Sequence, residues 1–245
     1  MGQAGRELLL ADLRRRIDGL DRRGARREGV LPFGVPDLDA HLPGGGLALG
    51  ALHEVMEEGE HGALAALFVA GILARRQGSV LWCVARRDLF APALACVGLH
   101  PDRVLYAETW RETQVLAAME EGLRHGGLAG VVGETGRLGL TPSRRLLLAA
   151  EASGVPAFAV RRGRAAPEPS AAVTRWRIAP APSGPATRPG LGRARWSVEL
   201  LRCRGADPRA WLLSGPDAQG RLAPPPDLAD GPRAQERGHR RAAAR

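Results

Sequence analysis

The fold is decided by the stretch Gly34-Val-Pro-Asp-Leu-Asp-Ala-His-Leu-Pro-Gly-Gly-Gly-Leu47 and by the segment that soon follows it, Leu52-His-Glu-Val-Met-Glu-Glu-Gly-Glu-His-Gly-Ala-Leu-Ala-Ala-Leu-Phe-Val-Ala70. The second segment predicts a strand, a loop with two glycines and an apolar helix. In many α/β proteins this order of elements binds a nucleotide phosphate, because N–H groups of the loop and of the helix N-terminus face the anion. The stretch therefore predicts a nucleotide-binding architecture.

The side chains that would hold the phosphate are missing from this loop. A phosphate-binding P-loop reads G-x-x-x-x-G-K-[ST], since the lysine reaches the terminal phosphates and the hydroxyl holds magnesium. Here Glu57 replaces the first glycine, Gly62 keeps the second, and Ala63 and Leu64 stand at the lysine and hydroxyl positions. The chain contains no lysine at all, and the acidic loop would repel a polyphosphate. We predict a degenerate P-loop that binds no cofactor.

Two further positions of an ATPase site are changed. After the loop helix, the next strand ends in Val84-Ala-Arg-Arg-Asp88, so an arginine stands where a glutamate would activate water. Arginine cannot act as a base, and Asp88 is the only carboxylate close by. Glu134 follows the central strand, where an acid would hold magnesium, but alone it cannot sustain phosphoryl transfer. We predict that the protein is not an enzyme.

The rest of the chain alternates helices and strands in an order typical of a mostly parallel sheet. The sequence predicts helices at residues 63–76, 89–97, 112–124 and 140–153, and strands at 79–85, 104–106, 129–132 and 156–160. Two strands with alternating faces follow at 173–178 and 196–201. Right-handed crossovers between the parallel strands would place helices on both faces of the sheet. The predicted fold class is therefore α/β, and residues 30–213 form its core.

The two ends of the chain differ from this core. Residues 6–23 have an amphipathic helical pattern and lead into a basic linker that ends at residue 29. This helix either packs on its own domain, which we favour, or docks on a partner. Residues 214–245 are rich in glycine, proline and arginine and contain the run Pro224-Pro-Pro226, so we predict a flexible, disordered tail.

Composition restricts the function classes. The formal net charge is +9, and all 35 basic residues are arginine, which favours acidic partners but also fits a GC-rich coding sequence. No apolar run approaches the ~20 residues of a membrane span, and no signal sequence begins the chain, so we expect a cytoplasmic protein without membrane contact. The three cysteines and six histidines show no spacing typical of a disulfide framework or a metal site.

Arginines gather near tryptophans late in the core. The candidate nucleic-acid contacts are Arg188, Arg193, Arg195, Arg202 and Arg204. Arginine binds phosphate and tryptophan stacks on unpaired bases, so this segment is a candidate for weak, salt-sensitive contact with single-stranded DNA. In the alternative interpretation, Trp176 and Trp196 fill the core side of edge strands. We favour the alternative for the tryptophans and leave the arginines open.

Several of these motifs resemble known families. The Gly34–Asp39 segment, the triple glycine 44–46 and Leu52-His-Glu-Val55 are similar to the entry into the core of RecA-type recombinases. The degenerate loop and three later segments resemble, more narrowly, the ImuA family of RecA-like, non-ATPase accessory proteins from bacterial inducible-mutagenesis cassettes. The three later segments are Val132-Gly-Glu-Thr-Gly-Arg-Leu138, Thr141-Pro-Ser-Arg-Arg-Leu-Leu-Leu148 and Arg195-Trp-Ser-Val-Glu-Leu-Leu-Arg202.

The resemblance implies a RecA-like fold and a non-catalytic adaptor in SOS-induced, error-prone translesion synthesis. The implied partners are a Y-family-like, ImuB-like mutagenesis protein and an error-prone DnaE-type polymerase, held directly or through the first; RecA is a further candidate. Two other functions stay open. SulA-type cell-division inhibitors resemble the same degenerate scaffold, and a RecA-like ATPase would require nucleotide binding without lysine.

Overall fold

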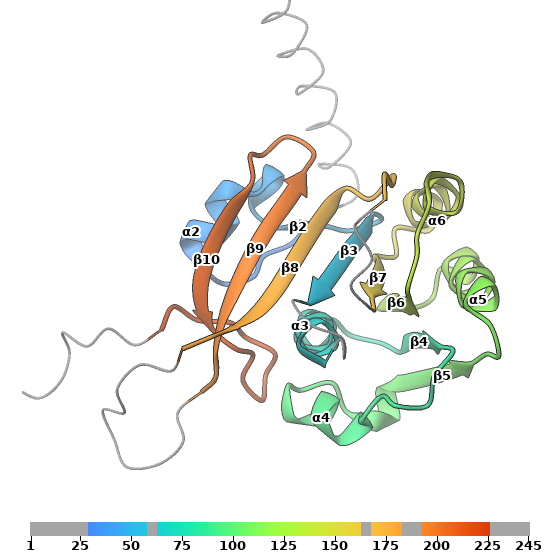
Figure 1. The fold of residues 1–245 in the computed structure, drawn as a ribbon, viewed down its shortest axis with the longest axis horizontal. Helices are drawn as coiled ribbons and strands as arrows, with labels where there is room; N and C mark the ends of the chain where they lie inside the picture. Colours follow the sequence, from blue (N-terminus) through green and yellow to red (C-terminus); the bar gives the residue numbers. More distant parts are fainter. Residues whose placement is uncertain (1–28, 58–62, 163–167, 183–192, 226–245) are drawn as a thin grey trace, which may run out of the picture.

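A computed structural model describes residues 29–57, 63–162, 168–182 and 193–225 (Figure 1). The helix predicted at residues 6–23, the loop residue Gly62, the candidate contact Arg188 and the tail from residue 226 lie outside these ranges. The described residues include no helix long and apolar enough to cross a membrane.

An eight-stranded sheet forms the centre of the molecule, in the order β10-β9-β8-β3-β7-β6-β4-β5. The strands from β8 to β5 in this order pair in parallel. On the β8 side, β9 pairs antiparallel with β8, and β10 pairs antiparallel with β9. Their bounds are β3 (Leu52–Glu57), β4 (Val80–Val84), β5 (Val104–Glu108), β6 (Gly130–Thr135), β7 (Ala157–Arg161), β8 (Thr174–Ala181), β9 (Arg195–Cys203) and β10 (Arg209–Ser214). The mostly parallel α/β sheet predicted from the sequence is confirmed.

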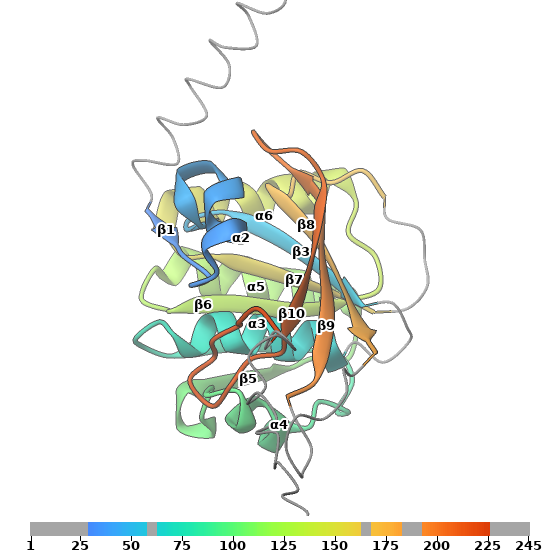
Figure 2. The same ribbon diagram turned by 90° about the vertical axis from the view of Figure 1, so that its left-hand side faces the viewer.

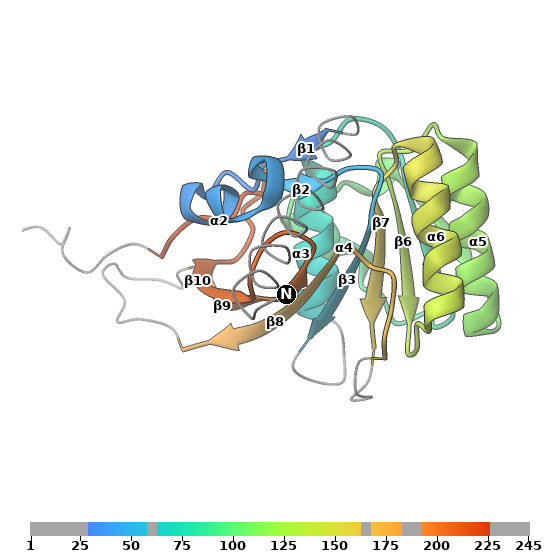
Figure 3. The ribbon, with the colours of Figure 1, turned by 90° about the horizontal axis from the view of Figure 1, so that it is seen from above.

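Helices cover both faces of the parallel part of the sheet (Figure 3). On one face lie α3 (Ala63–Ala74) and α4 (Ala91–Cys96), and on the other lie α5 (Glu112–His125) and α6 (Leu140–Ser153). Helix α2 (Pro36–His41) lies over the antiparallel strands, where Asp37 accepts a hydrogen bond from the Trp211 indole of β10 at 3.0 Å. Short elements β1 (Val30–Leu31), η1 (Pro43–Gly45), β2 (Leu47–Ala48) and η2 (Pro101–Arg103) complete the described fold.

Strand β7 shows why this sheet needs two helical layers. All five of its residues are buried, as is typical of a parallel strand covered on both sides. Phe158 and Val160 pack in the core that contains the α3 residues, whereas Ala157 and Ala159 pack in the core that contains the α5 and α6 residues. The small side chains on the second face leave room for helices to lie close to the strand.

The ordered core continues beyond the boundary drawn at residue 213. Residues 215–225, here called the C-terminal strap, cross α3 (Figure 2). Ser214 N–H donates to Ala223 O at 2.8 Å, and Leu222 is buried. A Cβ added to Gly71 of α3 would lie 2.9 Å from Pro216. The strap packs this closely because the helix offers a glycine there, a match that the tail's composition alone does not reveal.

Candidate functional site

The degenerate loop lies between β3 and α3, as predicted. Glu57, the last residue of β3, directs its carboxylate to the start of α3, where Oε2 accepts a hydrogen bond from Leu64 N–H at 2.8 Å. The amides at a helix N-terminus carry partial positive charge and commonly bind a phosphate. In this protein a side-chain carboxylate takes that role. Ala63 is exposed and Leu64 is half-buried, and neither side chain can contact phosphate through a charge or a hydroxyl.

The acid expected to hold magnesium is also engaged. Glu134 lies inside β6 rather than after the strand, because β6 extends to Thr135. Its Oε1 accepts a hydrogen bond from the Trp82 indole at 2.9 Å, and its Oε2 is 2.5 Å from the Arg162 guanidinium. Burial raises the pKa of Glu134, while the Trp82 hydrogen bond and Arg162 act against that increase. Both carboxylate oxygens therefore have a protein partner.

Arg162 connects two acids, Glu134 and Asp88, near the carboxyl ends of the parallel strands. It follows β7 and also lies 2.7 Å from Asp88, the carboxylate that follows β4. Asp88 was the nearest substitute for a catalytic glutamate, and here it pairs with a cation instead. Arg86 is exposed and offers no base. Among the described residues there is no group of three or more His, Cys, Asp or Glu that could hold a metal.

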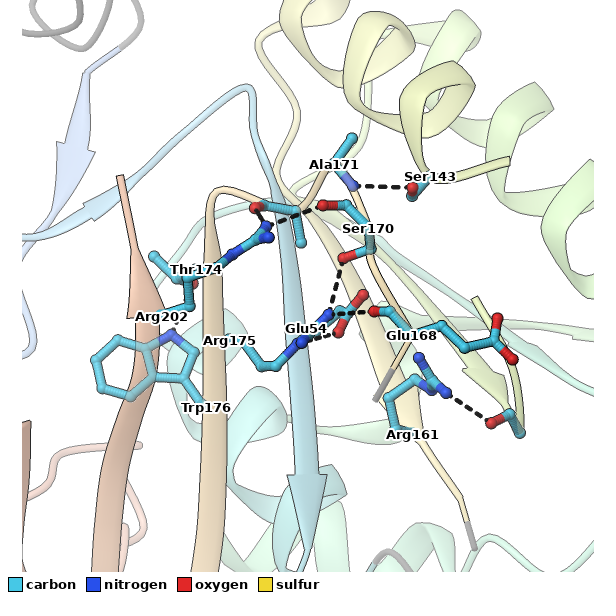
Figure 4. Close-up of polar contacts among 12 residues, drawn as sticks. Glu54, Ser143, Arg161, Glu168, Ser170, Ala171, Thr174, Arg175, Trp176 and Arg202 are labelled. Carbon is cyan, nitrogen blue, oxygen red and sulfur yellow. Dashed lines mark hydrogen bonds and ion pairs between the residues drawn. The ribbon is translucent and has the colours of Figure 1, made fainter. Parts of the chain in front are cut away.

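A second ionic network lies on the face of the sheet that bears α6 (Figure 4). Glu54 of β3 is fully buried and accepts a hydrogen bond from Arg175 Nε at 2.7 Å. Arg175 also donates to Glu168 O at 2.8 Å, and Arg202 donates to Ser170 O at 3.0 Å. These bonds fasten the segment that precedes β8 to the sheet.

Arg161 lies close to this network without bonding to it among the described residues. Its guanidinium donates to Gly136 O at 2.8 Å, while its Nε and Nη1 have no partner among the described residues. Burial lowers the pKa of Arg161, and the nearby Glu54 carboxylate opposes that decrease. The bond from Arg161 to Gly136 O links the end of β7 to the residue that follows β6.

The candidate DNA-contacting arginines do not form one cluster. Arg193 donates to Arg221 O at 2.6 Å, and Arg204 donates to Ala171 O at 3.3 Å. These two lie beyond opposite ends of β9, whose nine residues span about 27 Å. Arg202 binds main-chain oxygens of Ser170 and Ala172, and Arg195 begins β9.

The tryptophans near these arginines fill the core. Trp176 is fully buried and Trp196 is 4% exposed, so the prediction that both fill the core is confirmed. Their strands, β8 and β9, are inner strands of the sheet and not the edge strands that the interpretation assumed. Neither ring is available to stack on a base. The described tryptophan that is exposed is Trp110, at 90%, which the sequence analysis did not single out.

Sequence reasoning found the loop and Glu134 but missed their partners. Arg162 and the Glu54–Arg175 pair were not recognised as site residues. Their signal in the sequence is faint: charged residues sit within or directly after buried strands, where an unpaired charge would be costly. Such a residue calls for a partner, but the sequence does not say which one.

The fold of the described residues is RecA-like. No family model matches the chain, but its structure is similar to the crystal structure of the RadB recombinase, with a TM-score of 0.54 and 16% sequence identity over 79% of this chain and 99% of that one. Identity this low establishes the fold only.

More specifically, the chain belongs to the ImuA family. It is 43% identical over 206 residues to Protein ImuA of Caulobacter vibrioides, in strain NA1000 / CB15N and in strain ATCC 19089 / CIP 103742 / CB 15. The match covers 77% of this chain and 84% of that protein. The RecA-like fold and the family predicted from the motifs are both confirmed.

Proposed function

We propose that the protein is a non-catalytic adaptor in an ImuA/ImuB-type mutagenesis cassette, acting in SOS-induced, error-prone translesion DNA synthesis. Membership of the ImuA family supports the pathway. The observation that carries the non-catalytic part is the Glu57 carboxylate on Leu64 N–H, since an anion from the protein already binds where a phosphate would. The Arg162 bridge between Glu134 and Asp88 supports the same conclusion.

The proposed partners are the cassette's Y-family-like, ImuB-like protein and, directly or through it, an error-prone DnaE-type polymerase, with RecA as a further candidate. In this role the RecA-like core is a rigid scaffold, and the partners bind its surface or its terminal segments. A scaffold needs no nucleotide, so the altered loop costs it nothing in function. Family membership favours this role over a SulA-type division inhibitor.

The test is direct binding between the purified full-length chain and the purified Y-family-like protein from the same cassette, measured by titration calorimetry. Two truncations locate the contact: one lacks residues 1–28 and the other lacks residues 226–245. The second cut must not be placed earlier, because β10 pairs with β9 along its whole length and the strap packs on α3. Absence of binding by the full-length chain would contradict the adaptor role.

Nucleotide binding is tested separately by equilibrium dialysis with labelled ATP and Mg²⁺. The expected result is no retention, both for the natural chain and for the Glu57→Gly variant. The variant removes the carboxylate but restores neither lysine nor hydroxyl. If it still retains no ATP, the missing lysine and hydroxyl are enough to prevent binding, and if it retains ATP, the Glu57 carboxylate alone had blocked the site. Retention by the natural chain would overturn the non-catalytic proposal.

A further inference from the structure

Strand β5 has an open edge. It is the last strand in the sheet order, and it pairs only with β4 among the residues that the structure describes (Figure 1). Beyond its end, Thr109 N–H donates to Val84 O of β4 at 2.8 Å. Because successive N–H groups of a strand point to opposite sides, the N–H groups of Tyr106 and Glu108 point away from β4. The main chain therefore presents hydrogen-bonding groups along this edge.

Large apolar side chains are concentrated around the same edge. Of the seven exposed large hydrophobic residues in the described ranges, four belong to β5 or to the loops that leave the carboxyl ends of β4 and β5. They are Phe90 (69% exposed), Leu105 (55%), Tyr106 (41%) and Trp110 (90%). Natural edge strands are usually protected by charged side chains, proline or a bulge. Strand β5 has no proline and no bulge, and its one charged residue, Glu108 at the end of the strand, is paired with Arg87. An apolar, unprotected edge is typical of an interaction surface.

The charges beside the edge favour an acidic partner. Arg86 and Arg111 are exposed in the two loops and have no ion pair within the described ranges. Two of the acids close to them are already engaged, since Glu108 pairs with Arg87 at 2.7 Å and Asp88 pairs with Arg162 at 2.7 Å. Glu112, which follows Arg111, is exposed and has no ion pair within the described ranges. The net charge of +9 opposes pairing of this edge with a second copy of the chain.

We infer that the edge of β5 accepts an extended peptide segment of a partner protein as an additional strand. Apolar side chains of that segment cover Leu105, Tyr106 and Trp110, and its acidic side chains face Arg86 and Arg111. In this mode, main-chain hydrogen bonds supply affinity and the side-chain contacts supply selectivity. The inference rests on the proposed adaptor function, because it names the surface by which the adaptor holds a partner.

The test compares Tyr106→Pro with Tyr106→Ala in the full-length chain. Both variants lose the tyrosine ring, but only proline removes the outward N–H and blocks strand addition. Proline is tolerated at an edge position whose N–H faces away from the sheet, so the β4 pairing is kept; circular dichroism and the thermal midpoint check the fold. The probes are the cassette's Y-family-like protein and short overlapping peptides covering its sequence.

We expect an acidic, apolar peptide to bind, and Tyr106→Pro to weaken binding of both probes by about tenfold or more relative to Tyr106→Ala. Amide hydrogen exchange at Tyr106 and Glu108 should slow in the complex. Should the proline variant not fold, the double variant Arg86→Glu/Arg111→Glu serves instead. It should weaken binding at low salt, where the charge term is largest.

The contrary outcomes are separable. If the Y-family-like protein binds both tyrosine variants equally and the edge amides are not protected, the inference fails and the adaptor function stands. If it does not bind the natural chain, both fail. Protection of the edge amides that rises with protein concentration in the absence of a probe would show that a second copy occupies the edge, which also overturns the inference.

Discussion

Replacement of Arg162 by methionine should destabilise the protein in a manner that depends on pH. The substitution removes the cation that faces Glu134, whose side chain is 3% exposed, and leaves one hydrogen bond from Trp82. The pair with Asp88 contributes at most about 1 kcal/mol, because Asp88 is half-exposed. Removing one member of a buried ion pair costs about 3–5 kcal/mol, so Glu134 determines the size of the effect.

Protonation of Glu134 limits that cost. Each pH unit above the ordinary pKa of 4.5 adds about 1.36 kcal/mol to the price of protonation, so neutralising the group at pH 7 costs about 3.4 kcal/mol. The pKa of Glu134 is already raised by burial, and loss of Arg162 raises it further. An acid whose folded pKa lies above its unfolded pKa lowers stability as pH rises between the two. The variant is therefore most destabilised at neutral pH and recovers in acid.

Urea unfolding at pH 7 and pH 5.5 tests this reasoning. At pH 7 Glu134 should lower the free energy of unfolding of Arg162→Met by up to about 3.4 kcal/mol, and at pH 5.5 by no more than about 1.4 kcal/mol, because that pH lies one unit above the ordinary pKa of 4.5. The matched control is Glu134→Gln/Arg162→Met, whose difference from the natural chain should vary less with pH than that of Arg162→Met, because the control has no carboxyl group at position 134 to titrate. An equal loss for Arg162→Met at both pH values would refute the assignment of the cost to Glu134.

Three further predictions concern packing and thiol chemistry. Trp176→Ala should lower the free energy of unfolding by about 3–5 kcal/mol, because the Trp176 ring is fully buried. Trp110→Ala should change it by less than about 0.5 kcal/mol, because Trp110 is 90% exposed. Equal effects of the two variants in urea unfolding would contradict these placements. Gly71→Ala should lower the free energy of unfolding by about 1–3 kcal/mol, because the added methyl group forces the strap away from α3. As a control, removal of residues 226–245 should leave the unfolding midpoint unchanged. A Gly71→Ala variant as stable as the natural chain would refute the close packing. Native protein at pH 8 should react with a thiol reagent at Cys96, which is exposed, and much more slowly at Cys83 and Cys203. Burial raises the pKa of Cys83 to about 12 and of Cys203 to about 11, so few of these thiols are in the reactive thiolate form. The labelled positions are identified by mass spectrometry of peptides, and rapid labelling of Cys83 would contradict its burial.

The sequence predicted the parallel core well, because its elements carry strong local signals. Helix α6 matches its predicted range, Leu140–Ser153, since its apolar period is clear and glycines flank it. Strand β10 was not predicted as an element. Its segment Arg209-Ala-Trp-Leu-Leu-Ser214 is short, and its burial depends on pairing with β9. The strap was hidden for a similar reason, since its packing requires glycines that lie far away in the sequence.

The sequence predicted only those features of the site that the identity of one residue reveals. The absent lysine and the substitution at Glu57 are visible in the sequence, but the hydrogen bond from Leu64 to that carboxylate depends on the loop's path. Glu54 and Arg175 are 121 positions apart, and no local pattern pairs them. Charges on buried strands indicated that partners must exist, and the three-dimensional fold identified them.

The central claim, a RecA-like scaffold that works by holding mutagenesis proteins, is tested most directly by affinity purification of the tagged full-length protein from DNA-damaged native cells, with partners identified by mass spectrometry. The account predicts recovery of the cassette's Y-family-like protein, with or without a DnaE-type polymerase. Recovery of the tubulin-like division protein alone, without that partner, would contradict the account and favour a cell-division inhibitor.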